Sequence, residues 1–319
     1  MLYLNSKDIE EIVENIDLIE IVEKGFKMYG EKSYQMPDRI HLDKGEDTVL
    51  YMPCITKDII GTKILSLFPQ NKDKNLPVIS GIMLLNDIDT GLPKAILNGS
   101  SITAFRTGAL GSTGIKYTTK KDSKSIGLIG AGVQGFHQLL FAAKVRNIKN
   151  MYIFDKNKDK VDEFKVKLKK KLPNISIKVE DNIEKLVRNS DIIITATPSE
   201  SPVIPNDKDL LKGKHIIAIG SYKYKMREIP DALYDLLDEV YVDTELAVEE
   251  SGDIIQPLEK GLINKNQIKT LSEIMSREAD ITGKTTLFKC VGMALLDVVV
   301  AEGIFSKALE LKKGTKIPL

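Results

Sequence analysis

The sequence lacks several features that would place it in a specialised class of protein. It has only two cysteines, Cys54 and Cys290, too few for a disulfide scaffold or a cysteine zinc motif, which favours a reducing setting. Its formal net charge is +1 over 319 residues, so no overall field would attract nucleic acid or an anionic membrane. The N-terminus has no basic segment, and no apolar run is long enough to span a bilayer. We expect a cytoplasmic protein without nucleic-acid, membrane or metal partners.

The length predicts two domains, because a single core of 319 residues would be unusually large. From Ser123 onward, continuous apolar runs such as "SIGLIGA", "DIIITATP" and "KHIIAIGS" alternate with amphipathic helical patterns. This alternation is typical of a parallel sheet covered by helices on both faces. We therefore predict an α/β protein in which residues 121–294 form a Rossmann-type, doubly wound parallel sheet. Residues 1–120 and 295–319 would form an α+β domain into which this sheet is inserted.

The predicted α+β domain begins with helical spacing of apolar residues over 6–32, with Ser6 as a plausible cap. Residues 34–98 contain four β-rich runs separated by turn residues, which predicts an antiparallel meander. A helix rich in small residues follows over 100–119. Near the C-terminus, residues 285–311 are predicted to form one long apolar helix.

A glycine motif stands at the start of the predicted parallel sheet. Gly130, Gly132 and Gly135 form G-x-G-x-x-G between an apolar strand and a helix, an arrangement that binds dinucleotide pyrophosphate through backbone amides and the helix dipole. The next strand, "NMYIFD", ends in Asp155, about twenty residues further on, where a carboxylate would bind ribose hydroxyls. This carboxylate favours NAD(H) over NADP(H), although the adjacent Lys156 leaves room for NADP(H). The alternative is a structural glycine turn with Asp155 at the surface.

Polar residues follow two later strands of the same predicted sheet. Because the carboxyl ends of parallel strands line the ligand crevice of such sheets, Thr195, Thr197 and Ser221 are candidate cofactor neighbours. Each of them alone is more often simply a polar residue at a strand end.

Three cations upstream of the glycine motif lie in apolar or small-residue surroundings: Arg39 in "MPDRIHL", Lys63 in "IGTKILSLF" and Arg106 in "ITAFRTGA". A buried ammonium is costly unless it is paired or used, and a guanidinium can bind a carboxylate with two bonds. If the three converge, they form a site for a small carboxylate, with Lys63 near enough to move a proton. The alternative is that each cation bonds a neighbouring acid.

These stretches together resemble the ornithine cyclodeaminase/mu-crystallin family, which includes ketimine reductases and archaeal-type alanine dehydrogenases. The resemblance also covers "YMPC", "SDIIITATPSESPV", "ESGDIIQPL" and "TLFKCVGMALLD", in the family's order over nearly the whole chain. It implies a substrate-binding and dimerisation domain with an inserted NAD(P)-binding domain, and a homodimer formed through the first.

The resemblance also implies roles for individual residues. Arg39, Lys63 and Arg106 match positions that hold the substrate carboxylate, with Lys63 as the catalytic acid or base. The other expected substrate contacts are Tyr222 and Val291. The expected cofactor contacts are Arg106, Thr107, Gly130, Gly132, Val133, Gln134, Gly135, Asp155, Thr195, Thr197, Ser221 and Cys290.

One departure from the family bears on the reaction. Tyr222 stands where the cyclodeaminases have an Asp that handles the substrate amine, and a tyrosine with a pKa near ~10 is a poor base at neutral pH. We therefore predict an NAD(P)H-dependent reductase of small cyclic ketimine carboxylates, of the type that converts Δ1-pyrroline-2-carboxylate to proline. The alternatives are ornithine cyclodeaminase with catalytic NAD+, then an alanine or other amino-acid dehydrogenase, then a non-catalytic binder of small ligands similar to mu-crystallin.

Overall fold

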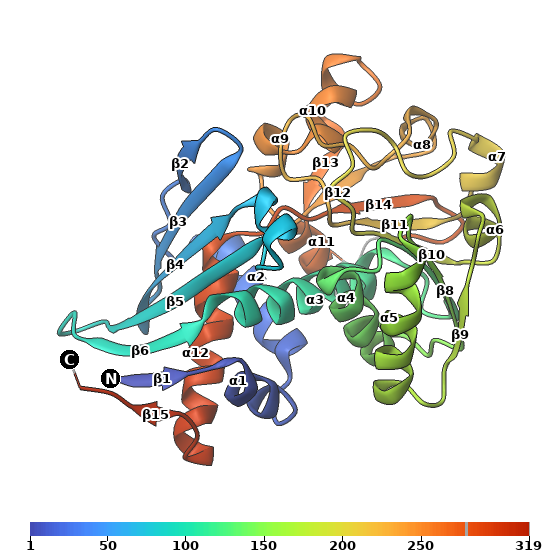
Figure 1. Cartoon of the computed structure of the whole chain (residues 1–319). Helices are drawn as coiled ribbons and strands as arrows, with labels where there is room; N and C mark the ends of the chain where they lie inside the picture. Colours follow the sequence, from blue (N-terminus) through green and yellow to red (C-terminus); the bar gives the residue numbers. More distant parts are fainter. Residues whose placement is uncertain (278–279, 319) are drawn as a thin grey trace. The chain divides into compact units, whose positions relative to one another are not determined.

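The computed structural model describes residues 1–277 and 280–318, which divide into two units (Figure 1). The first unit comprises residues 1–106 and 293–319, and the second comprises residues 107–292. The predicted α/β fold with a Rossmann-type parallel sheet is confirmed, since the second unit contains such a sheet. None of the helices in the described chain is long and apolar enough to cross a membrane.

The first unit is built on a seven-stranded sheet with the strand order β15-β1-β6-β5-β4-β3-β2. Its strands are β1 (Leu2–Leu4), β2 (Ile40–Lys44), β3 (Asp47–Ile55), β4 (Ile59–Leu67), β5 (Ile79–Asp87), β6 (Pro93–Asn98) and β15 (Thr315–Lys316). Strands β2 to β6 run antiparallel to their neighbours in chain order, so the predicted meander is confirmed. The first and last strands, β1 and β15, pair with each other beside the chain ends marked in Figure 1.

Among the described residues, three α-helices belong wholly to this unit: α1 (Ser6–Val13), α2 (Leu18–Glu31) and α12 (Ala294–Leu311). A short 3-10 helix, η1 (Pro69–Lys74), joins β4 to β5. The helical spacing predicted over 6–32 corresponds to two helices, and the expected cap at Ser6 is wrong. Asn5 caps α1 and Asp17 caps α2, because each side chain accepts first-turn amides. α12 packs on β3, β4 and β5 and on α1 and α2, so it covers one face of the meander (Figure 1).

The second unit contains an eight-stranded sheet with the order β13-β12-β14-β11-β10-β7-β8-β9, and every pairing in it is parallel. Its strands are β7 (Ser125–Ile129), β8 (Asn150–Phe154), β9 (Ser176–Val179), β10 (Ile192–Thr195), β11 (His215–Ala218), β12 (Val240–Val242), β13 (Ile268–Thr270) and β14 (Thr286–Lys289). The prediction of a single helix over 285–311 is wrong, because the first residues form β14 in the interior of the sheet. The helix α12 begins only at Ala294.

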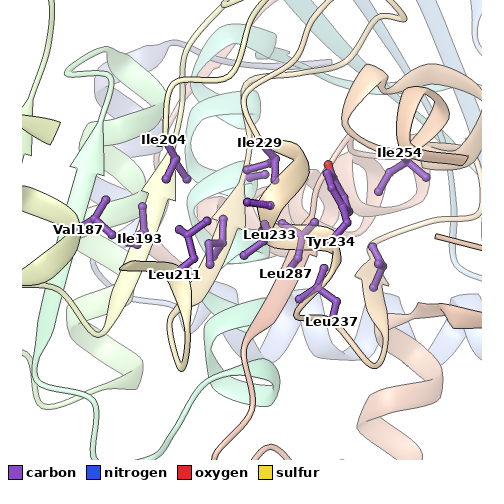
Figure 2. Packing of buried hydrophobic residues seen from close by; sticks show 14 of the residues in the cluster. Val187, Ile193, Ile204, Leu211, Ile229, Leu233, Tyr234, Leu237, Ile254 and Leu287 are labelled. Atoms are coloured by element: carbon purple, nitrogen blue, oxygen red, sulfur yellow. The ribbon is translucent and has the colours of Figure 1, made fainter. Parts of the chain in front are cut away.

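Helices cover the sheet and create its core. They are α4 (Val133–Val145), α5 (Lys158–Lys171), α6 (Ile183–Arg188), α7 (Lys208–Leu211), α8 (Asp231–Tyr234), α9 (Ala247–Glu250), α10 (Gly252–Glu259) and α11 (Leu271–Arg277). Figure 2 shows part of this core, where Ile193 and Leu287 of the sheet pack with Leu211, Leu233 and other residues of the covering helices. The predicted helix over 100–119 is α3 (Gly99–Thr118), which begins in the first unit and continues into the second.

Candidate functional site

The first unit brings two of the three predicted cations together. The Lys63 ammonium lies 2.6 Å from one oxygen of Asp297, and the Arg106 Nε donates to the other oxygen at 2.8 Å. Lys63 and Asp297 are 0% exposed, and Arg106 is 6% exposed. Two of the three cations therefore converge, and they do so on an acid that the sequence analysis did not single out. The alternative that each cation bonds an acid thus also describes Lys63 and Arg106, and a role of the pair in substrate binding stays a prediction.

The alternation of β4 explains why Lys63 is buried. Gly61, Lys63 and Leu65 lie on the face of the meander that α12 covers, and a side chain at Gly61 would meet Val298 of α12 at 2.5 Å. Asp297 lies in the first turn of α12, directly before Val298. The close approach of this helix to β4 thus places a carboxylate beside the lysine.

Burial lowers the pKa of Lys63 from 10.5 to about 8, against the opposing effect of the Asp297 carboxylate. The positive charges of Arg106 and Arg39 contribute to this lowering of the pKa. Burial alone would raise the pKa of Asp297, but Arg106 and Lys63 hold it below its ordinary value. Asp297 is therefore ionised at neutral pH, and Lys63 can gain or lose its proton near the physiological range.

Lys63 and Arg106 have side-chain donors that no described residue uses. A lysine ammonium carries three N–H groups and a guanidinium carries five. Within residues 1–277 and 280–318, Asp297 is the one hydrogen-bond acceptor of the Lys63 ammonium and of the Arg106 guanidinium. Arg39, in the loop before β2, is half-buried and near enough for its charge to act on Lys63. This cluster, Lys63, Arg106, Asp297 and Arg39, can therefore accept a further anionic group.

In the second unit, the glycine loop joins β7 to α4. Gly130 has a φ of +107°, and a Cβ there would lie 2.6 Å from the Ala196 carbonyl oxygen. A Cβ at Gly135 would lie 2.2 Å from the Gly130 carbonyl oxygen. Gly132 differs, because no described heavy atom beyond the glycine and its chain neighbours lies within 4 Å of the position that its Cβ would take. The fold itself requires the first and third glycines, whereas the second leaves open space over the start of α4, as a phosphate group would need.

The start of α4 is available to a ligand. Its N-cap is Gly132, so the N-cap residue has no side chain to bind the first-turn amides. Val133 is 66% exposed, and Gln134 is half-buried, with its Oε1 buried and without a partner among the described residues. Asp155, directly after β8, accepts the Ala131 amide at 2.8 Å through Oδ2 and the Asn157 amide at 2.8 Å through Oδ1. The loop, the helix start and Asp155 are thus assembled at one place, and they fit a dinucleotide.

Glu228 connects the two strand ends that carry Thr197 and Ser221. One Glu228 oxygen accepts the amide and the hydroxyl of Thr197, and the other accepts the Gly220 amide. The Ser221 hydroxyl donates to the Met226 carbonyl at 2.7 Å, while the buried Thr195 hydroxyl has no partner among the described residues. Thr197 and Ser221 therefore shape the carboxyl edge of the sheet, and their contact with a cofactor stays a prediction.

Behind this edge lies a fully buried charge network. Asp253 accepts the amides of Glu228 and Ile229, and the Lys289 ammonium lies 3.3 Å from its other oxygen. Burial raises the pKa of Glu228, although the charge of Lys289 opposes this effect. The network fixes the loop over 220–229 relative to β14.

The loop after β14 carries Cys290 and Val291, the expected neighbours of nicotinamide and substrate. Asp243 accepts the Val291 amide at 3.1 Å and the Gly292 amide at 2.6 Å, so it determines the course of this loop. Cys290 is buried.

Two other expected contacts differ in their surroundings. Tyr222 is half-buried, and this burial raises its pKa, so it stays a neutral phenol. Thr107 is buried, and its carbonyl accepts the Gln138 amide at 2.7 Å.

The sequence analysis missed Asp297, Glu228 and Asp243. A signal existed for Asp297, because it is the one acid in the apolar run "VGMALLDVVVA". Glu228 and Asp243 follow strands or lie in loops with other polar residues, and nothing in the local sequence distinguishes them.

Comparison with known proteins finds relatives that match nearly the whole chain. A sequence model of the ornithine cyclodeaminase/mu-crystallin family matches residues 1–312. The chain is 32% identical over 328 residues to a Delta(1)-pyrroline-2-carboxylate reductase of Bacillus cereus, with 99% of each chain covered.

Two solved structures are similar over the full length. The first is Thermococcus litoralis Delta(1)-pyrroline-2-carboxylate reductase in complex with NADH and L-proline, with a TM-score of 0.93, 34% identity, and 99% of this chain and 100% of that chain covered. The second is an archaeal alanine dehydrogenase dimer with bound NAD, with a TM-score of 0.90, 28% identity, and 100% of this chain and 99% of that chain covered.

Proposed function

The chain belongs to the ornithine cyclodeaminase/mu-crystallin family, and from this premise we propose that it is an NADH-dependent reductase of small cyclic ketimine carboxylates. Its model reaction is the conversion of Δ1-pyrroline-2-carboxylate to L-proline. The observation that carries the proposal is the buried pair of Lys63 and Arg106, whose unused donors suit an anionic substrate. The full-length similarity to two pyrroline-2-carboxylate reductases supports it.

In the proposed reaction, Arg39 and Arg106 bind the substrate carboxylate and so orient the ring. Lys63 donates a proton to the imine nitrogen, and its pKa of about 8 suits a proton donor near neutral pH. NADH, when bound, supplies the hydride that reduces the imine carbon. One hydride and one proton are added across the C=N bond, which yields the cyclic amino acid and NAD+. Lys63 is left neutral and regains its proton from solvent.

The second unit provides the cofactor site in this proposal. The amides at Gly132 and at the uncapped start of α4 bind the pyrophosphate, and Asp155 accepts hydrogen bonds from the hydroxyls of the adenosine ribose. The same carboxylate repels a 2′-phosphate, so NADH is preferred over NADPH. The remaining proposed cofactor contacts are Arg106, Thr107, Gly130, Val133, Gln134, Gly135, Thr195, Thr197, Ser221 and Cys290.

Tyr222 distinguishes this reductase from the cyclodeaminase alternative. A cyclodeaminase needs a group that assists the substrate amine during ring closure, and a neutral phenol with a raised pKa is a poor base for that step. Reduction of an imine that is already cyclic has no such step, so Tyr222 can contact the ring without taking part in proton transfer.

The deciding experiment is a matrix of steady-state rates with NADH and NADPH. The substrates are Δ1-pyrroline-2-carboxylate, its six-membered homologue, pyruvate with ammonia, and ornithine with catalytic NAD+. We expect consumption of NADH with the cyclic imines and none with ornithine. Release of ammonia from ornithine would identify a cyclodeaminase instead, and cofactor binding without any turnover would identify a binding protein.

We also propose a homodimer formed through the outer face of the seven-stranded sheet. α12 covers one face, and the other carries an apolar row in which Ile40, Tyr51, Ile64 and Ile82 are direct partners across four strands. Ile40 and Ile82 are 53% and 44% exposed. Contiguous exposed apolar surface marks an interaction site, and the similar alanine dehydrogenase is a dimer.

A further inference from the structure

Asp297 lies in the cation cluster, but the proposed reaction assigns it no contact with the substrate. We infer that Asp297 is a positioning residue of the proposed reaction: its carboxylate holds Lys63 with one oxygen and Arg106 with the other, so that their remaining donors face the substrate. This inference rests on the proposed function, because it assigns Asp297 a task in that reaction.

The geometry supports a shared anchor. Lys63 comes from β4, Arg106 from α3 and Asp297 from α12, so three separate elements meet at one carboxylate. A lysine side chain has four flexible bonds, and burial alone does not fix the direction of its ammonium. The bond of 2.6 Å to Asp297 does fix it, and the bond of 2.8 Å to Arg106 Nε leaves both Nη groups of the guanidinium for a ligand. A carboxylate substrate could then be bound by a fork that is already oriented.

The charge balance of the cluster leads to the same conclusion. Within the described part of the chain, the two buried cations share one buried carboxylate, so one positive charge has no counter-ion there. A second acid would remove the need for a ligand, whereas loss of Asp297 would leave two buried cations unbalanced, which is strongly destabilising. Cys54 faces the cluster from β3, and burial and the charge of Asp297 raise its pKa to about 12, so it adds no charge. Arg39 adds positive charge from the loop before β2.

Asp297 also acts on the proton of Lys63. Burial, Arg106 and Arg39 lower the pKa of Lys63, and Asp297 is the group that raises it. An Asp297→Asn variant should therefore lose the ammonium at lower pH. An Asp297→Glu variant keeps the charge but moves it by one methylene, so it should alter the orientation of the cations more than their protonation.

The test compares wild type, Asp297→Asn, Asp297→Glu and Glu302→Gln. Glu302 is a half-buried acid of the same helix outside the cluster, so its amide variant is the matched control. For each protein, kcat/KM for Δ1-pyrroline-2-carboxylate is measured from about pH 6 to about pH 10. Binding of L-proline by calorimetry, the dissociation constant of NADH and the circular dichroism spectrum are measured alongside.

In Asp297→Asn, we expect the decline of kcat/KM at alkaline pH to begin about one pH unit or more lower than in wild type. Asp297→Glu should keep the wild-type decline but lose about a hundredfold in kcat/KM, as expected for a small displacement of catalytic groups. L-proline binding should weaken in both variants, NADH binding should not change, and Glu302→Gln should match wild type.

Folded variants with the wild-type pH profile and the wild-type KM would overturn the inference. If Asp297→Asn does not fold, Asp297→Glu decides, because wild-type kcat/KM in that variant would overturn positioning. A wild-type protein that neither reduces the imine nor binds L-proline refutes the proposed function, and with it the task assigned to Asp297. If only the role of Asp297 is wrong, the wild type still reduces the imine and binds L-proline, so this outcome can be distinguished from failure of the proposed function.

Discussion

Replacing Asp155 with alanine should abolish the preference for NADH. A carboxylate has about four acceptor positions. The Ala131 and Asn157 amides use two of them in this structure. The remaining two equal the number of hydroxyls on an unmodified adenosine ribose. Asp155 can thus bind this ribose without releasing the glycine loop.

The expected magnitude follows from these bonds. A hydrogen bond to a charged group contributes about 1.5–3 kcal/mol, and the lower value suits a half-exposed site, so two hydroxyl bonds give about 3 kcal/mol. This corresponds to a loss of about a hundredfold in NADH affinity. The lost bond to Ala131 loosens the loop and should weaken both nucleotides by about tenfold. NADPH also gains from the removal of charge repulsion, so the ratio of the two affinities should fall by at least about a hundredfold.

The assay is a fluorescence titration of NADH and NADPH with wild type, Asp155→Ala and Asp155→Asn. The amide keeps one acceptor oxygen and loses the charge, so its affinity ratio should fall between the other two. A Lys156→Ala variant shows how far the neighbouring lysine helps NADPH. Equal weakening of both nucleotides in Asp155→Ala would refute the reasoning, because Asp155 would then act only on the loop through Ala131.

Three further outcomes are expected. Lys63 must carry its proton to donate it, so kcat/KM for imine reduction should fall about tenfold per pH unit above a pKa of about 8. The Lys63→Arg variant should be slower and should not show this decline. A decline that persists in Lys63→Arg would mean that another group causes it. The Ile82→Glu variant should be monomeric in size-exclusion chromatography with light scattering. The control variant Leu92→Glu should remain dimeric, because Leu92 lies at an exposed turn position off the sheet face. A dimeric Ile82→Glu variant would place the interface elsewhere. Gly132→Ala should melt at the wild-type temperature but bind NADH weakly, whereas Gly135→Ala should lose thermal stability; tight NADH binding by Gly132→Ala would argue against phosphate at that position.

The sequence predicts those elements whose pattern is decided locally. The meander, the alternation of strand and helix and the glycine loop each have a characteristic period or turn residues, and all three are present. The break between α1 and α2 was not predicted, because both helices bury residues in one core and the apolar spacing continues across Asp17. β14 was taken for helix, because a strand buried on both faces has no alternation to separate it from the apolar helix that follows.

The sequence identified the cations of the candidate site, but it did not predict which residues they contact. A lysine inside an apolar strand indicates a buried charge, but its partner depends on tertiary packing. Asp297 lies 234 residues from Lys63 in the chain. The contacts of Glu228 with Thr197 and Gly220 depend in the same way on how strand ends meet, and no local period encodes them.

The pairing of Lys63 with Asp297 also limits the order in which the chain can fold. During synthesis, the meander emerges before the second unit, but α12, which covers it, and β15, which pairs with β1, are made after the second unit. Until then the lysine has no counter-ion, and the inner face of the sheet is without its helix. The second unit has all its strands before α12 leaves the ribosome and can mature first. The first unit therefore begins before the second unit is made and can be completed only after it.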